Sequence, residues 1–306
     1  MPRAHRCFLP NHVWHITHRC HKQEFLLKFA RDRDCWRYWL FEARKRYGLC
    51  VLNYIITSNH IHLLVLDQGN GEIAQSMQLI AGRTAQEYNR RKQRKGAYWE
   101  DRYHATAIDS DQYLARCMTY VDMNMVRAGV VSHPADWRWS GYCEIQSPAR
   151  RYAVINQPAL MNLFAMPSFQ HFQSTHKQWL KAALIDNEPR REAMWSQSLA
   201  VGHKSYVEHV QAALDIKAQH RTVVEEEGGY RLKEPFIPYS PHFDSKMGGL
   251  SQDNGYIWDD NLSITKSCVG PTPLLATRKT GPRHAPTTVR DKNTPSFPRA
   301  SGGNPC

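Results

Sequence analysis

Two histidines separated by one residue lie in the segment Ser58-Asn59-His60-Ile61-His62-Leu63-Leu64-Val65. Side chains of a β-strand alternate between its two faces, so His60 and His62 are predicted to share one face while Ile61 and Leu63 point to the other. Two imidazoles on one face can bind a divalent metal ion or transfer protons. The same spacing also fits two ordinary surface histidines, because His-x-His alone is a weak signal.

A second set of reactive side chains lies on a helix predicted from about residue 111 to 128, where Arg116, Tyr120, Asn124 and Arg127 form one polar stripe. A metal ion held by two histidines needs a further protein ligand, and the Asn124 amide is the candidate. Tyr120 precedes Asn124 by one turn, so its phenol could attack a metal-polarised phosphate and form a phosphotyrosine. The two arginines could hold flanking phosphates. A half-buried helix aromatic is the alternative for Tyr120.

A basic run, Arg90-Arg91-Lys92-Gln93-Arg94-Lys95, is followed at once by Tyr98, Trp99 and Arg102. Cations interleaved with aromatic rings suit single-stranded nucleic acid, because cations bind phosphates and rings stack on unpaired bases. The chain has a formal net charge of +12, and its first 150 residues carry 22 Lys and Arg against 14 Asp and Glu. This balance favours a polyanionic partner. A solvated helix end in a merely basic protein is the alternative.

The elements that must position these residues follow from hydrophobic periodicity. Strands are predicted at residues 12–17, 50–56, 60–66 and 103–108, with helices at 31–47, 71–92 and 111–128. The order strand–helix–strand–strand–helix–strand is that of a ferredoxin-like split βαβ sheet. The sequence therefore predicts an α+β fold with an antiparallel sheet, followed by the helix that carries Tyr120.

The second half of the chain is less regular. Residues 176–194 and 204–218 are predicted to be helices, and Gly202, which closes the segment between them, is expected to form a turn before the second helix. Residues 222–262 have no clear period. From about residue 266 the chain is rich in Thr, Pro, Arg and Lys, which predicts disorder. We therefore divide the chain into a domain at 8–145, a mostly helical accessory extension of unknown role at 146–262, and a disordered basic tail at 263–306.

Other features bound the class of protein. No run of about eighteen apolar residues predicts a membrane span, and the first residues lack the apolar core of a signal peptide. The eight cysteines are widely spaced without a Cys-x-x-Cys pair. This spacing argues against a zinc ribbon or a disulfide scaffold and favours a reduced, cytoplasmic setting.

Several of these motifs together resemble the single-tyrosine HUH transposases of insertion sequences, and most closely the REP-associated tyrosine transposases. The resemblance covers roughly residues 8–145. It rests on the segments Trp14-His15-Ile16-Thr17-His18-Arg19, Asn59-His60-Ile61-His62-Leu63-Leu64, Tyr98-Trp99-Glu100-Asp101-Arg102-Tyr103, Tyr120-Val121-Asp122-Met123-Asn124 and Trp137-Arg138-Trp139-Ser140-Gly141-Tyr142. Two positions depart from the family pattern, because Cys20 replaces a usual Gly and Met125 a usual Pro.

The resemblance implies an HUH endonuclease in which His60, His62 and Asn124 bind Mg²⁺ or Mn²⁺ and Tyr120 is the nucleophile. Such an enzyme attacks single-stranded DNA near a hairpin, forms a 5′-phosphotyrosine link with a free 3′-OH, and reverses the step during strand transfer. The insertion-sequence enzymes are dimers, so a homodimer is expected among the partners. The basic residues expected to contact DNA are Arg19, Arg90, Arg91, Lys92, Arg94, Lys95, Arg102, Arg116 and Arg127.

Two other functions remain compatible with these residues. A domesticated DNA-binding protein could keep the fold and no longer cleave. A metallohydrolase could use the histidine pair on a small molecule and would not need Tyr120.

Overall fold

A computed structural model describes residues 8–186, 192–218, 221–226 and 228–233 of the chain. The predicted basic tail at 263–306 lies outside the described residues, as does the end of the predicted extension. Among the residues described, every helix is too short or too polar to cross a lipid bilayer.

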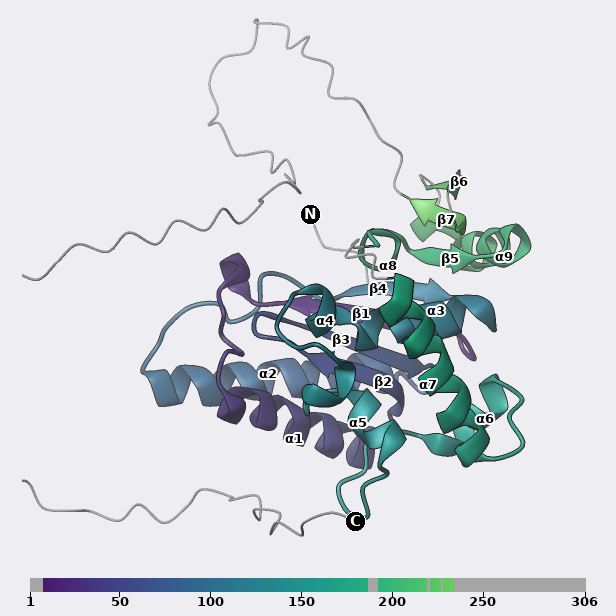
Figure 1. The fold of residues 1–306 in the computed structure, drawn as a ribbon. Helices are drawn as coiled ribbons and strands as arrows, with labels where there is room; N and C mark the ends of the chain where they lie inside the picture. Colours follow the sequence, from purple (N-terminus) through teal and green to yellow (C-terminus); the bar gives the residue numbers. More distant parts are fainter. Residues whose placement is uncertain (1–7, 187–191, 219–220, 227, 234–306) are drawn as a thin grey trace, which may run out of the picture. The chain divides into compact units, whose positions relative to one another are not determined.

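The first half of the chain forms the predicted split βαβ sheet (Figure 1). Its elements are β1 (Val13–Arg19), α1 (Ala30–Tyr47), β2 (Cys50–Ile56), β3 (His60–Leu66), α2 (Glu72–Lys92) and β4 (His104–Ile108), with a short 3₁₀ turn η1 (His21–Gln23) after β1. The strand order is β2-β3-β1-β4, and all three pairings are antiparallel. The ferredoxin-like prediction is therefore confirmed, and α1 ends as predicted at Gly48, whose φ of 72° is left-handed.

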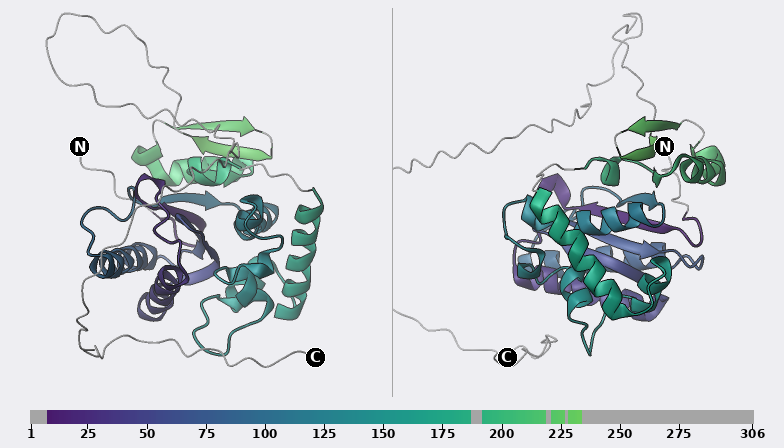
Figure 2. Two further views of the ribbon diagram at one scale, coloured as in Figure 1. Left: turned by 60° about the vertical axis from the view of Figure 1, so that its left-hand side comes forward. Right: turned by 45° about the vertical axis from the view of Figure 1, so that its right-hand side comes forward.

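The two faces of this sheet carry different helices. Helices α1 and α2 contact each other along one face (Figures 1 and 2). The opposite face carries α3 (Gln112–Asp122) and α4 (Asn124–Arg127), which together replace the single predicted helix at 111–128. The break falls at Met123, whose φ and ψ of −76° and −3° remain in the right-handed helical region. Leu114, Met118 and Val121 are fully buried and form the apolar side of α3.

The rest of the described chain adds helices and three more strands. These elements are η2 (Pro134–Asp136), α5 (Gly141–Gln146), α6 (Gln157–Leu163), α7 (Phe169–Asp186), α8 (Met194–Gln197), β5 (Ala200–Gly202), α9 (Lys204–Leu214), η3 (Asp215–Ala218), β6 (Thr222–Glu226) and β7 (Gly229–Lys233). Strand β5 pairs in parallel with β4 and extends the sheet to β2-β3-β1-β4-β5-β7-β6. The sequence predicted no strand at residues 200–202, whereas the turn predicted at Gly202 falls where β5 ends and α9 follows. The β6–β7 hairpin lies where no periodicity was found.

This later segment covers both edges of the four-stranded sheet. At the β4 edge it supplies β5. At the β2 edge, Ile56 N–H donates to the carbonyl of Trp139 at 2.9 Å, and Asn156 N–H donates to that of Val51 at 2.8 Å. Every residue of β2 is buried, although it is an edge strand. The later segment therefore pairs with part of this edge and leaves less of it open to another chain.

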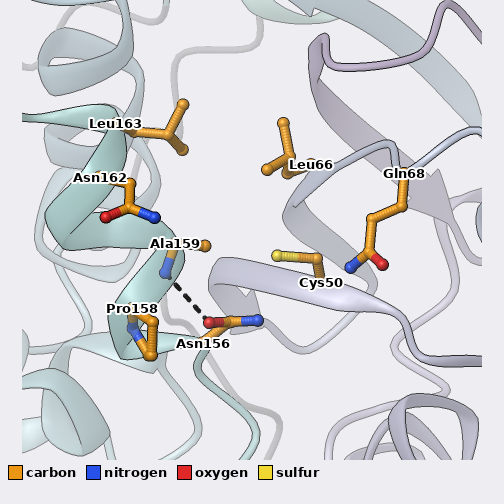
Figure 3. A pocket seen from close by; sticks show the side chains of 8 residues that line it. All are labelled: Cys50, Leu66, Gln68, Asn156, Pro158, Ala159, Asn162 and Leu163. Carbon is orange, nitrogen blue, oxygen red and sulfur yellow. Dashed lines mark hydrogen bonds between the residues drawn. The ribbon is translucent and has the colours of Figure 1, made fainter.

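A pocket of about 420 Å³ lies where α6 meets the ends of β2 and β3 (Figure 3). The Asn156 side chain, at its rim, accepts a hydrogen bond from Ala159 N–H at 3.1 Å and so caps α6. The pocket lining includes Cys50, Gln68 and Asn162 and contains no charged side chain. A polyanion would find no counter-charge there.

A buried polar cluster ties α7 to the helix that carries Tyr120. His176 Nε2 lies 2.8 Å from Asp122 Oδ2, and both side chains are fully buried. The other oxygen of Asp122 accepts a hydrogen bond from Asn53 Nδ2 at 3.0 Å. A buried carboxylate that lost one of these partners would keep its desolvation cost without the compensating bond. The pair therefore holds α3, β2 and α7 together.

The cluster predicts a large effect of His176→Leu, which should lower the free energy of unfolding by about 2–4 kcal/mol because Asp122 would lose its buried partner. Urea denaturation followed by circular dichroism measures this change. His171→Leu is the matched control, because His171 is exposed on the same helix. Equal, small effects of the two substitutions would show that the buried pair contributes nothing.

Candidate active site

The pairing of β1 with β3 places the two histidines on the sheet face that α3 covers. Thr17 is paired with His62 and Arg19 with His60, so these four side chains point to the same face. The ring centroids of His60 and His62 are 5.0 Å apart. The predicted common face is confirmed, and the rings are close enough to share one ion.

Hydrogen bonds at His60 select which ring nitrogen carries the proton. His60 Nδ1 lies 2.7 Å from Asn59 Oδ1 and 3.1 Å from Thr57 Oγ1. The Thr57 hydroxyl hydrogen is directed to the His60 carbonyl at 2.8 Å, so Oγ1 acts as an acceptor toward the ring. Both contacts therefore require a proton on Nδ1. In neutral His60 the lone pair is then on Nε2, as a metal ligand requires.

Hydrogen bonds that link Trp195, His15 and His62 determine which nitrogen of His62 carries the proton. The carbonyl of Trp195 lies 2.9 Å from His15 Nδ1, and His15 Nε2 lies 2.9 Å from His62 Nδ1. A carbonyl only accepts, so His15 Nδ1 carries the proton. Full burial lowers the pKa of His15 to about 4, which leaves this ring neutral and Nε2 an acceptor. His62 must then donate through Nδ1 and hold its lone pair on Nε2.

Asn124 faces that lone pair. Its Nδ2 lies 3.0 Å from His62 Nε2, a hydrogen bond that fits the deduced proton positions. A half turn of the amide would exchange Nδ2 for Oδ1 at nearly the same place. Two imidazole nitrogens and one amide oxygen then form a set that suits a divalent ion such as Mn²⁺ and leaves positions for substrate oxygens. In the described part of the chain, His, Cys, Asp and Glu side chains alone form no group of three that could hold a metal ion.

Tyr120 lies beside His62 and His15. Its ring packs edge-on against His62 with centroids 5.7 Å apart and against His15 at 6.2 Å. The guanidinium carbon of Arg127 lies 4.1 Å from the ring centroid, and Arg127 Nη2 donates to the Tyr120 carbonyl at 2.9 Å. Only 3 % of Tyr120 is exposed. The i, i+4 spacing therefore does bring Tyr120 and Asn124 to the histidine pair.

The remaining predicted DNA contacts are scattered over the surface. Arg19 lies opposite His60, next to the site. Arg116 forms an ion pair with Glu192 at 2.9 Å. Arg90, Lys92, Lys95 and Arg102 are exposed. Arg91 pairs with Asp32, and Arg94 lies 3.5 Å from Glu24. The end of α2 thus keeps several exposed cations, and Arg116 is turned toward the later segment.

Sequence reasoning missed His15 and the Trp195 carbonyl as parts of the site. His15 lies in the same strand phase as Thr17 and Arg19, so its position on the histidine face could have been inferred. The Trp195 carbonyl also lies 3.2 Å from the Thr106 hydroxyl, which donates to it. A backbone carbonyl 180 residues away from His15 has no signature in the sequence.

Comparison with known proteins places the first part of the chain. Residues 9–124 match the family model described as "Transposase IS200 like". No curated protein matches the chain. One similar solved structure is a REP-associated tyrosine transposase bound to a REP hairpin, with 16% identity, a TM-score of 0.41 and coverage of 48% of this chain and 87% of that one. Another is a Deinococcus radiodurans R1 protein described as a transposase, with 15% identity, a TM-score of 0.29 and coverage of 39% and 95%.

The buried histidine generates a pH prediction. His15 binds its proton at a lower pH in the folded chain than in the unfolded chain, where the pKa is 6.5. Below pH 6.5 the unfolded state therefore takes up the proton first, and stability falls as the pH falls toward 4. Between pH 7 and pH 5 this group should cost about 2 kcal/mol. Urea denaturation of the protein and of His15→Gln at both pH values isolates it; identical losses in the two proteins would refute the assignment.

Proposed function

We propose that the protein cleaves and rejoins hairpin-forming single-stranded DNA through a 5′-phosphotyrosine intermediate, and the match of residues 9–124 to the "Transposase IS200 like" model supports a DNA-processing enzyme. The observation that carries the proposal is the meeting of Tyr120, His62 and Asn124 within one chain. The tyrosine ring packs against His62, and the Asn124 amide contacts the His62 nitrogen that holds the lone pair.

His60 and His62 would each present Nε2, and Asn124 its amide oxygen, to a Mg²⁺ or Mn²⁺ ion. Such an ion supplies Lewis-acid polarisation of the scissile phosphate. The Thr57 and Asn59 contacts to His60 and the His15 contact to His62 keep both lone pairs directed inward. The protein therefore pre-sets both imidazole tautomers before DNA binds, which is what outer hydrogen bonds do at metal sites.

In the cleavage step, Tyr120 Oη attacks phosphorus and the bond from phosphorus to the 3′ oxygen breaks. The phenol gives up its proton, the departing 3′ oxygen takes up a proton, and the 5′ phosphate stays on Tyr120. Attack by a 3′-OH on this phosphotyrosine reverses the step and releases the phenol. The Arg127 guanidinium, stacked on the ring, places positive charge beside the forming link.

All of these groups come from a single chain, so the proposed chemistry needs no residue of a second copy. The homodimer expected from the resemblance stays a prediction. The specificity for hairpin DNA is likewise part of the proposal.

A second candidate is a DNA-binding protein of the same fold that does not cleave. The burial of Tyr120 favours it, because only 3 % of that residue is exposed beneath Arg127. The buried tyrosine would have to become more exposed before its phenol could attack a DNA phosphate. The two candidates differ in whether a covalent adduct forms.

Tyr120→Phe should abolish the covalent protein–DNA adduct, because the hydroxyl oxygen is the attacking atom. Incubation with 5′-labelled and 3′-labelled hairpin oligonucleotides and Mn²⁺, followed by denaturing electrophoresis, measures the adduct and its polarity. Tyr113→Phe is the matched control, since Tyr113 is also a buried tyrosine of α3. Binding without any adduct in the unaltered protein would favour the second candidate, and full hydrolysis of a small ester by Tyr120→Phe would favour a metallohydrolase.

His60→Ala should lower the cleavage rate by at least about 100-fold, because a metal ligand is lost. DNA affinity should stay close to that of the unaltered protein, since phosphate contacts supply most of it. Cleavage assays and fluorescence anisotropy measure the two quantities, with exposed His209→Ala as the control. A collapse of binding together with cleavage would mean that His60 is a structural residue.

A further inference from the structure

The loop between β1 and α1 holds two phenylalanine rings out in solvent. Phe25 is 65 % exposed and Phe29 is 58 % exposed, whereas Leu26 and Leu27 between them are buried. The buried pair anchors the loop: Leu27 N–H donates to the Ser58 carbonyl at 2.9 Å, and the Tyr98 hydroxyl donates to the Leu26 carbonyl at 3.3 Å. The backbone thus fixes both phenylalanines on the surface, and they are two of the five large hydrophobic side chains that are exposed in the described part of the chain.

Cations surround these rings. Lys22, Lys28 and Arg31 are exposed on the loop and at the start of α1, and Lys92 and Lys95 are exposed at the end of α2. Lys92 Nζ lies 5.6 Å from the centroid of Phe29. In Figure 1 the purple loop that enters α1 and the end of α2 lie on the same side of the sheet.

The acidic groups near this surface are already paired with arginines. Glu24 lies 3.5 Å from Arg94, Asp32 pairs with Arg91, and Asp34 lies 3.1 Å from Arg138. Asp32 also attracts Lys92 and Arg31, but these three carboxylates, each already paired with an arginine, leave the five exposed cations in excess. A polyanion that also carries flat apolar groups matches both properties of the surface.

The loop is bonded to the turn that orients His60. Cys20 N–H donates to the Asn59 carbonyl at 2.7 Å, and Asn59 Nδ2 donates to the Gln23 carbonyl at 3.3 Å. The Oδ1 atom of the same Asn59 accepts from His60 Nδ1. The loop is therefore anchored directly beside the histidine pair, within reach of a strand bound there.

We propose that Phe25 and Phe29 stack on unpaired bases of the single strand that extends from the active site, while Lys22, Lys28, Lys92 and Lys95 bind its phosphates. The proposal rests on the proposed function, since single-stranded DNA must first occupy the site. The loop is a binding surface and takes no part in the chemical step.

Phe25→Ala and Phe29→Ala should each weaken binding of a hairpin with a single-stranded extension by about tenfold, the effect of losing one base–ring stack. Fluorescence anisotropy measures the affinity. Tyr152→Ala is the matched control, because Tyr152 is an aromatic residue that is 51 % exposed and lies elsewhere on the surface. The cleavage rate at saturating DNA should stay unchanged in both variants.

Three companion measurements decide the mode of contact. Phe25→Trp and Phe29→Trp should keep the affinity of the unaltered protein, whereas Phe25→Leu should weaken it as Phe25→Ala does. An extension with abasic sugars should bind the unaltered protein and the Ala variants equally. An unchanged tenfold loss on the abasic strand would overturn base stacking, and so would Ala variants that bind normal DNA like the unaltered protein.

The outcomes separate this proposal from the proposed function. If the unaltered protein cleaves DNA covalently and the Ala variants bind DNA as it does, base stacking by the loop is refuted and the proposed active site stands. No DNA binding by the unaltered protein would refute both. Loss of binding to anionic phosphatidylserine vesicles in the Ala variants, with DNA affinity intact, would assign the rings to a lipid surface and overturn the proposal.

Discussion

The site depends on one buried hydrogen bond, from His62 Nδ1 to His15 Nε2 at 2.9 Å. A neutral imidazole has one donor and one acceptor, so the proton position on each ring follows from the bond made by its other nitrogen. The Trp195 carbonyl sets the proton positions on both rings, because a carbonyl can only accept and His15 Nδ1 must therefore donate to it. The lone pair of His62 is therefore directed toward Asn124 by a carbonyl on the far side of His15. Without that carbonyl, either tautomer of His62 would be equally compatible with the sheet.

This constraint makes the later segment part of the active site, although the family match ends at residue 124. Trp195 lies in α8, and His176 of α7 holds Asp122 two residues after Tyr120. Both contacts are buried, so each also requires correct packing of the segment to which it belongs. The described part of this segment fixes the proton on a metal-ligand candidate and the position of the helix that carries Tyr120. These contacts support the geometry of the first half of the chain.

Sequence patterns predicted the parts of this arrangement that depend on local periodicity. The period of two placed His60 and His62 on one face, and the helical period placed Tyr120 beside Asn124, because both rules act within a single element. The Trp195 carbonyl and the β4–β5 pairing join residues far apart in the chain, so no local rule finds them. β5 has three residues, too few for a periodic signal. The sequence of the accessory segment therefore shows no clear strand pattern, and its strands form by pairing with the sheet of the first half of the chain.

The replacement of Gly by Cys20 shows how the same turn serves two purposes. Cys20 has φ and ψ of −66° and 149°, an ordinary extended conformation, so a side chain costs nothing there. The left-handed residues are instead Lys22 and Gln23, with φ of 51° and 59°. Such backbone costs of order 1 kcal/mol per residue and persists only where neighbours enforce it. Here the Cys20 and Gln23 bonds to Asn59 enforce it. The strained turn that leads the loop toward Phe25 and the amide that orients His60 are therefore held by one set of bonds, so a change that relaxes the turn also loosens the metal-ligand candidate.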